Sequence, residues 1–138
     1  MTKVYVLDAC ALIAFINGEP GAAKVKTILT EALAGNNEVY MNKFNAYEVY
    51  YGFYKDEGKQ KADEIYGMIL KLPISIIDTF EDNVFSEAAR LKTRYGISIA
   101  DSIALGESVV RDAFFATSNH HELDIVEQQE QIKFFWIR

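Results

Sequence analysis

The most informative stretch of the sequence is Val4-Tyr-Val-Leu-Asp8-Ala-Cys-Ala-Leu-Ile-Ala-Phe15. A short β-rich run ends at Asp8 and an unbroken apolar run follows, which predicts a buried strand over residues 4–7 and a helix over residues 9–16. A carboxylate between two apolar runs costs several kcal/mol to bury unless it is paired or holds a cation. Asp also caps helices well. Asp8 is therefore both a candidate functional residue and a candidate helix cap.

The pattern of a strand followed by helices continues along the chain. We expect four more strands over residues 39–41, 74–77, 113–117 and 132–137, and helices over residues 22–33, 45–55, 59–70, 81–94 and 100–111. This alternation predicts an α/β fold with a parallel sheet covered on both faces. The chain has two prolines, eight glycines and no low-complexity run, so no linker is evident and one domain over residues 1–138 is expected.

The composition limits the possible partners. The 138 residues are 50% hydrophobic and 25% charged, and 14 Lys and Arg against 20 Asp and Glu give a net charge of −6. This balance argues against a broad basic surface for duplex DNA, although a local patch or a metal could still hold phosphate. No apolar stretch is long enough to span a membrane, and a single cysteine excludes an intramolecular disulfide. We expect a soluble cytoplasmic protein without a membrane partner.

Two further carboxylates stand near the starts of predicted helices. Glu48 lies three residues after Asn45, and Asp101 lies three residues after Ser98. This spacing also fits a capping box, so each acid alone indicates a cap as readily as a ligand. Together with Asp8 they suit a hard divalent cation such as Mg²⁺, which prefers oxygen ligands. Such an ion can activate water and stabilise displacement at a phosphodiester, which reconciles an acidic chain with a polyanionic substrate.

Other reactive or aromatic residues are interpreted structurally. Cys10 and the adjacent His120 and His121 lack the spacing of a zinc site, so we expect a small core residue and a solvated turn. The helix over residues 45–55 carries more aromatic residues than one buried face needs. These residues are Phe44, Tyr47, Tyr50, Tyr51, Phe53 and Tyr54. The surplus predicts a surface for a partner protein.

Taken together, these blocks make the chain resemble the PIN-domain ribonucleases, in particular the VapC-type toxins of toxin–antitoxin pairs. The resemblance lies in the opening block and in Asn45-Ala-Tyr-Glu48-Val-Tyr-Tyr-Gly52, Ser98-Ile-Ala-Asp101-Ser-Ile-Ala-Leu105 and Phe115-Ala-Thr117-Ser-Asn119-His120. No single block is specific. All four in this order and at these spacings, over nearly the whole chain, are a strong match.

The resemblance implies a three-layer α/β/α PIN-like domain with a central, mostly parallel sheet and an acidic pocket for Mg²⁺ or Mn²⁺. It further implies a metal-dependent endoribonuclease that is the toxin of a type II pair, with an RNA substrate, a cognate antitoxin and a homodimeric state. Carried over by position, Asp8 and Asp101 are the main metal ligands. Glu48 binds the metal directly or through water and helps to orient the attacking water, and Thr117 supports the pocket through its hydroxyl.

Asn119 departs from the family pattern, which commonly has Asp at this position. An amide oxygen can still coordinate a metal but brings no charge, so a second metal is expected to bind more weakly. Either one tightly bound metal is enough, or Glu122 or Asp124 replaces the missing carboxylate.

Two other functions stay open. A catalytically weak or inactive PIN domain could act as a protein-binding module. A receiver domain of two-component signalling would use Asp78, Thr117 and Lys133 in addition to an acid after the first strand. That reading is weaker, because Ala9 stands where receivers usually carry a second acid and because the acids of the two later helices are left unexplained.

Overall fold

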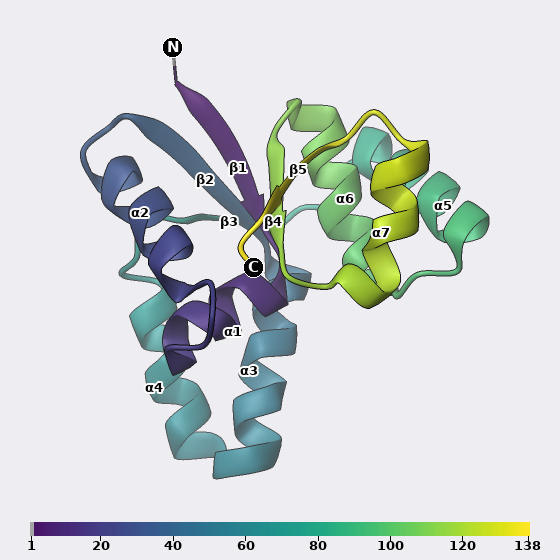
Figure 1. The fold of residues 1–138 in the computed structure, drawn as a ribbon. Helices are drawn as coiled ribbons and strands as arrows, with labels where there is room; N and C mark the ends of the chain where they lie inside the picture. The colour runs from purple at the N-terminus through teal and green to yellow at the C-terminus, as the bar shows by residue number, and fades with distance from the viewer. Residues whose placement is uncertain (1) are drawn as a thin grey trace.

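A five-stranded sheet, in which all strands are parallel, forms the centre of the molecule (Figure 1). The computed structural model describes residues 2–138. The strands are β1 (Lys3–Leu7), β2 (Asn37–Asn42), β3 (Ser75–Ile77), β4 (Phe114–Thr117) and β5 (Lys133–Trp136). Their order in the sheet is β3-β2-β1-β4-β5, so β1 is the central strand. The predicted α/β fold is confirmed.

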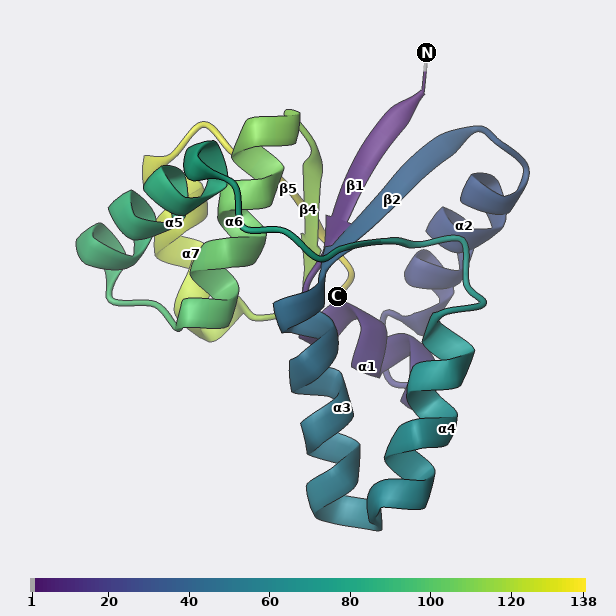
Figure 2. The ribbon, with the colours of Figure 1, turned by 180° about the vertical axis from the view of Figure 1, so that it is seen from behind.

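Within residues 2–138, seven helices cover the two faces of this sheet. They are α1 (Ala9–Asn17), α2 (Ala22–Leu33), α3 (Lys43–Glu57), α4 (Lys59–Ile69), α5 (Asp82–Tyr95), α6 (Ile99–Arg111) and α7 (His120–Gln129). Helices α1 to α4 lie on one side and α5 to α7 on the other, which gives the expected three layers (Figure 1). Seen from behind, α3 and α4 form a hairpin that extends beyond the strands (Figure 2). None of these helices is long and apolar enough to cross a membrane.

Strand β1 separates two hydrophobic cores because its side chains alternate between the faces of the sheet. Tyr5 and Leu7 are buried against α1 to α4, whereas Val6 is buried against α5 to α7. Leu91, Leu105 and other apolar residues of the second core lie far from β1 in the sequence. The two cores fix the strand between them, and with it the position of the residue that follows.

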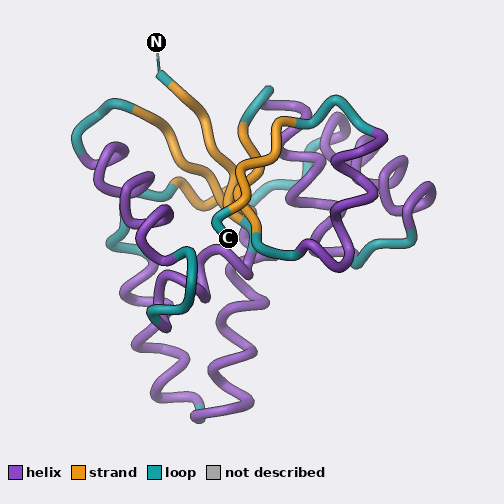
Figure 3. The backbone as a smooth tube through the Cα atoms, in the orientation of Figure 1, coloured by secondary structure: helices purple, strands orange, loops and turns teal. Residues whose placement is uncertain are grey.

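The chain order creates a switch point at the carboxyl ends of β1 and β4. The chain runs from β1 outward to β2 and β3, and then returns to the other side of β1 to form β4. In sheets of this kind the crevice at such a point is the usual ligand site. Leu7 pairs with Ala116, so Asp8, directly after β1, lies beside Thr117, the last residue of β4. The strands converge toward this end of the sheet (Figure 3).

Three local expectations from the sequence are wrong. His120 and His121 lie in the first turn of α7, a helix that the sequence did not reveal because most of its residues are polar and only Leu123 and Val126 are buried. Cys10 is exposed rather than part of the core, whereas its neighbours Ala9 and Ala11 on α1 are buried. The third helix begins at Lys43, two residues earlier than predicted.

A buried polar network attaches α6 to the end of β2. Glu107 is 1% exposed and accepts hydrogen bonds from the amide of Asn42 at 2.9 Å and from Nε of Arg111 at 3.4 Å. The guanidinium of Arg111 lies 4.2 Å from the ring centroid of Tyr40. Asn42 also caps α3, because its Oδ1 accepts the Phe44 amide at 2.8 Å. The network therefore ties the start of α3 to the middle of α6.

Removal of the Glu107 carboxylate should weaken this attachment. Glu107→Ala leaves the buried amide of Asn42 and the partly exposed guanidinium of Arg111 without their acceptor, so we expect a loss of about 1–3 kcal/mol in the free energy of unfolding. Glu107→Gln keeps an acceptor oxygen and should lose less. Urea unfolding of both variants, with the exposed Glu64→Ala as control, measures the effect; equal stability of all three would contradict the role of the network.

Candidate functional site

Asp8 is held rigidly where β1 ends. Its Oδ1 accepts the Ala11 amide at 2.8 Å as the cap of α1, and its Oδ2 accepts the Thr117 hydroxyl at 2.5 Å. The side chain is only 1% exposed. The hydroxyl of Thr117 also accepts a hydrogen bond from the backbone N–H of Asn119 at 3.0 Å, which fixes the direction of the hydroxyl. The two interpretations of Asp8 are thus compatible: it is a helix cap, and each carboxylate oxygen keeps a free lone pair.

Asp101 and Glu48 differ in how their helices hold them. The Ser98 hydroxyl caps α6 and accepts the Asp101 amide at 3.1 Å, so Asp101 stands in the first turn of its helix. Glu48 lies farther inside α3, which is capped by Asn42 rather than Asn45. The capping-box interpretation of Glu48 is therefore wrong, and its position needs another explanation.

These acids surround one pocket of about 410 Å³ between α1, α3, α6 and α7. Its lining residues are Ala9, Cys10, Ile13, Glu48, Tyr51, Gly52, Ser98, Asp101, Asn119 and Glu122. Asp8 is buried directly before the first two of them. None of the described lining residues is cationic. The structure thus brings Glu48, Asp101 and Asn119 to one cavity. Asp8 and Thr117 do not line it and are buried.

Asn119 presents its amide nitrogen, not its oxygen, to the acids. Its Nδ2 donates to Asp101 at 3.4 Å and to Glu122 at 3.3 Å, while its Oδ1 accepts the Glu122 amide at 3.4 Å as the cap of α7. Glu122 is the carboxylate that joins the pocket. Asp124 instead pairs with His120 at 2.8 Å, on an exposed part of α7.

Burial and mutual repulsion perturb all three acids. Burial raises the pKa of Asp8 to about 6, against hydrogen bonds from Thr117 and the Ala11 amide that lower it. Burial and then the charge of Asp8 raise the pKa of Asp101 to about 7. The pKa of Glu48 is also raised, mainly by burial. Because each raised pKa marks a carboxylate that is costly to ionise, this group gains from a nearby cation.

The donor set suits a magnesium-like ion, which a protein usually binds through one or two carboxylates and water. Within residues 2–138, no three acidic, His or Cys side chains are close enough to enclose a metal ion between them. A fully protein-made cage is thus not present, whereas the oxygen chemistry and the excess negative charge fit an ion that keeps part of its water shell.

Cys10 lines the same pocket but is a poor nucleophile. Partial burial, followed by the charges of Asp8 and Asp101, raises the pKa of its thiol to about 12. The thiolate is the reactive form of cysteine. The neighbouring acids therefore keep this side chain protonated.

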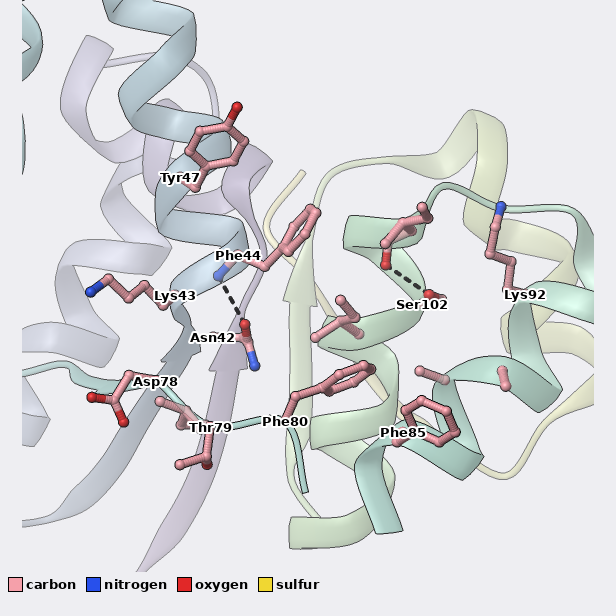
Figure 4. Close-up of a pocket in the computed structure, with 15 residues that line it drawn as sticks. Asn42, Lys43, Phe44, Tyr47, Asp78, Thr79, Phe80, Phe85, Lys92 and Ser102 are labelled. Carbon is pink, nitrogen blue, oxygen red and sulfur yellow. Dashed lines mark hydrogen bonds between the residues drawn. The ribbon is translucent and has the colours of Figure 1, made fainter. Parts of the chain in front are cut away.

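A second, larger depression of about 650 Å³ lies between the start of α3, the loop after β3, and helices α5 and α6 (Figure 4). Its exposed side chains are mainly apolar and include Phe44, Tyr47, Phe80, Phe85 and Ile99. Figure 4 shows Asp78 and Lys43 at one side of this depression. It holds none of the acids of the pocket described above.

The positions of Asp78 and Lys133 argue against a receiver domain. Asp78 follows β3 at the edge of the sheet, two strands from β1. Lys133 pairs with Phe114 at the amino end of β4, opposite to the acidic pocket, and its amine lies 3.4 Å from Asp112. The residues that a receiver would need are therefore on different edges of the sheet.

Comparison with known proteins identifies the family. The model of the PIN domain family matches residues 5–125, so the chain belongs to the PIN domain family. A sequence search among curated proteins found no match.

Several solved structures have a similar fold. VapBC2 from Rickettsia felis bound to a DNA fragment from its promoter matches with a TM-score of 0.75 and 20% identity, over 96% of this chain and 98% of that chain. DNA-bound VapBC from Salmonella typhimurium matches with a TM-score of 0.74 and 13% identity, over 100% of both chains. FitAcB from Neisseria gonorrhoeae matches with a TM-score of 0.65 and 14% identity, over 95% of this chain and 96% of that chain. At these identities the likeness shows the fold alone.

The raised pKa of Asp101 predicts an unusual pH dependence of stability. Below its ordinary pKa of 3.8 the carboxyl is protonated in both states. Between that value and about 7 the unfolded chain ionises first, so metal-free protein loses stability as the pH rises. Asp101→Asn removes this loss.

We compare the free energy of unfolding of Asp101→Asn with that of wild type. The difference in favour of the variant should be about 2–4 kcal/mol larger at pH 8 than at pH 4. Denaturant unfolding in EDTA at both pH values measures this difference. The exposed Asp112→Asn serves as control and should follow wild type. A constant difference between Asp101→Asn and wild type at both pH values would show that the carboxyl is not perturbed.

Proposed function

We propose that this PIN domain is a metal-dependent endoribonuclease and the toxin of a type II toxin–antitoxin pair. The observation that carries the proposal is the set of perturbed acids at the switch point of the sheet: Asp8, Glu48 and Asp101. Perturbed acids in a cleft are typical of functional sites. Apart from the cap that Asp8 gives to α1, the group of carboxylates without a cationic partner costs stability at neutral pH, which favours a functional role.

The residues have separate tasks in this proposal. Asp8 and Asp101 bind Mg²⁺ or Mn²⁺, and the bond from Thr117 keeps the Asp8 carboxylate facing one direction. When bound, the ion lowers the pKa of water and neutralises charge on the phosphodiester. Glu48, which is half-buried on the neighbouring helix, orients the attacking water and accepts its proton on a carboxylate oxygen.

Asn119 favours a single strongly bound ion. Its Nδ2 faces Asp101 and Glu122, so it supplies hydrogen bonds to the acids where a carboxylate would add negative charge. To coordinate an ion itself, the amide would have to turn and give up its cap on α7. Glu122 is then the remaining acid for a second ion, and Asn119 stays a candidate ligand only in that turned state.

The cation also explains how an acidic chain handles RNA. The net charge of −6 offers no general attraction to a polyanion. A bound divalent ion in the pocket supplies the positive charge at the point where the phosphodiester is cut. We also propose that the protein acts in the cytoplasm, because that is the compartment of its RNA substrate.

An antitoxin is the proposed protein partner, because similar structures are VapBC and toxin–antitoxin complexes. The exposed tyrosines of α3 offer it a surface. Tyr47, Tyr51 and Tyr54 are each about half exposed, and Tyr51 also lines the acidic pocket. A partner seated on this helix would cover the mouth of the pocket and block RNA. The family resemblance further implies a homodimer.

A weak or inactive domain that only binds protein is the second candidate. It is favoured by the absence, within residues 2–138, of three acidic, His or Cys groups close enough to enclose a metal. Metal-dependent activity of the purified protein separates the two functions.

The direct test is cleavage of a structured RNA pool by wild type with Mn²⁺, Mg²⁺ or EDTA. We expect cutting with either ion, none in EDTA, and a loss of about 100-fold or more in Asp101→Asn, because that variant lacks a main ligand. Asp112→Asn changes an exposed acid just before β4, at the opposite end of the sheet from the pocket, and should cut as wild type does. Equal cutting by all three proteins would assign the activity to a contaminant, and no cutting by wild type would favour the binding module.

A further inference from the structure

We propose that Asn45 is a positioning residue that sets the distance between Glu48 and Asp101. The inference rests on the proposed function, since it assigns a role in the same pocket. Asn45 lies in the first turn of α3 and is 0% exposed. It stands one turn before Glu48 on the same helix.

The side chain of Asn45 bridges the two helices that carry these acids. Its Nδ2 donates to the backbone carbonyl of Ala100 at 3.1 Å, and Ala100 directly precedes Asp101 on α6. Glu48 follows one turn after Asn45 on α3, so this bond holds the turn that carries Glu48 against the turn that carries Asp101. One side-chain amide thus connects the two halves of the pocket.

The bridge is needed because the two helices belong to different cores. Ala46 and Val49 of α3 pack into the first core, whereas Ala104 and Leu105 of α6 pack into the second. Apolar packing therefore fixes each helix to its own face of the sheet. The hydrogen bond from Asn45 to the Ala100 carbonyl is a direct polar link between α3 and α6, and it lies beside the acids.

The side-chain oxygen of Asn45 indicates that Asn is not the most stabilising residue at this position. Among the described residues, Oδ1 of Asn45 is buried and has no hydrogen-bond partner. An unpaired buried acceptor is unfavourable, and an apolar residue of similar shape would avoid it. Asn at this position is therefore best explained by its donor group.

The chain contains a matched control. Asn37 is also buried, also has an Oδ1 without a partner among the described residues, and also uses Nδ2 as a donor, to Glu31 at 3.4 Å. It lies at the start of β2, at the opposite end of the sheet from the pocket. Asn37→Ala and Asn45→Ala remove the same chemical group from similar surroundings, but only the second change touches the pocket.

The experiment is calorimetric titration of the full chain with Mn²⁺, with thermal unfolding of each variant in EDTA measured in parallel. We expect Asn45→Ala to bind Mn²⁺ about tenfold more weakly than wild type, the range found for groups that orient metal ligands. Asn37→Ala should lose stability yet bind within about twofold of wild type. If Asn45→Ala does not fold, Asn45→Ser replaces it; its shorter donor should restore folding while binding stays several-fold weaker.

The outcomes separate this inference from the proposed function. If wild type binds Mn²⁺ and the Asn45 variant binds it with the same affinity, the positioning role is overturned and the proposed nuclease is left intact. Equal losses in Asn45→Ala and Asn37→Ala also overturn it, because the effect then follows general stability. No Mn²⁺ binding by wild type overturns the metal site itself, and the positioning role with it.

Discussion

Burial of carboxylates at the carboxyl ends of the parallel strands carries an electrostatic cost, and the surrounding structure is arranged to offset it. Asp8 is 1% exposed and Asp101 is 9% exposed, and the charge of the first raises the pKa of the second. The protein offers hydrogen bonds from Thr117, Asn119 and helix amides to these acids, but no described cationic side chain lines the pocket. Hydrogen bonds reduce the cost of ionisation only in part. A divalent cation is the simplest means of removing the remainder.

The fold meets this constraint by using the same residues for capping and for the site. Asp8 caps α1, Ser98 caps α6 above Asp101, and Asn119 caps α7 while its amide nitrogen faces two acids. A cap fixes a side chain against the first turn of a helix, which limits its rotation. The pocket is therefore built from helix starts, where short polar side chains are already ordered. Asn42 and Asn45, at the start of α3, also use their side-chain amides to hydrogen-bond to α6.

The parts of the fold with strong local patterns could be predicted from the sequence, whereas the details of the site could not. The apolar run beside Asp8 indicated β1 and α1, and alternation of strands and helices indicated the parallel sheet. Helix α7 was missed because its sequence is mostly polar and its two buried residues give little periodicity. The start of α3 at Lys43 depends on the Asn42 cap, so the capping box assigned to Glu48 was wrong. The direction of an amide, as in Asn119, depends on neighbours that only the tertiary structure brings together.

The proposed function requires that the pocket between α1, α3, α6 and α7 binds a divalent cation through Asp8 and Asp101. Anomalous scattering from a crystal of the wild-type protein grown with Mn²⁺ tests this binding. We expect a manganese peak in this pocket, within coordination distance of one or both of these carboxylates, at roughly 2 Å. The absence of a peak at saturating Mn²⁺, or a peak only at other acids of the surface, would contradict it.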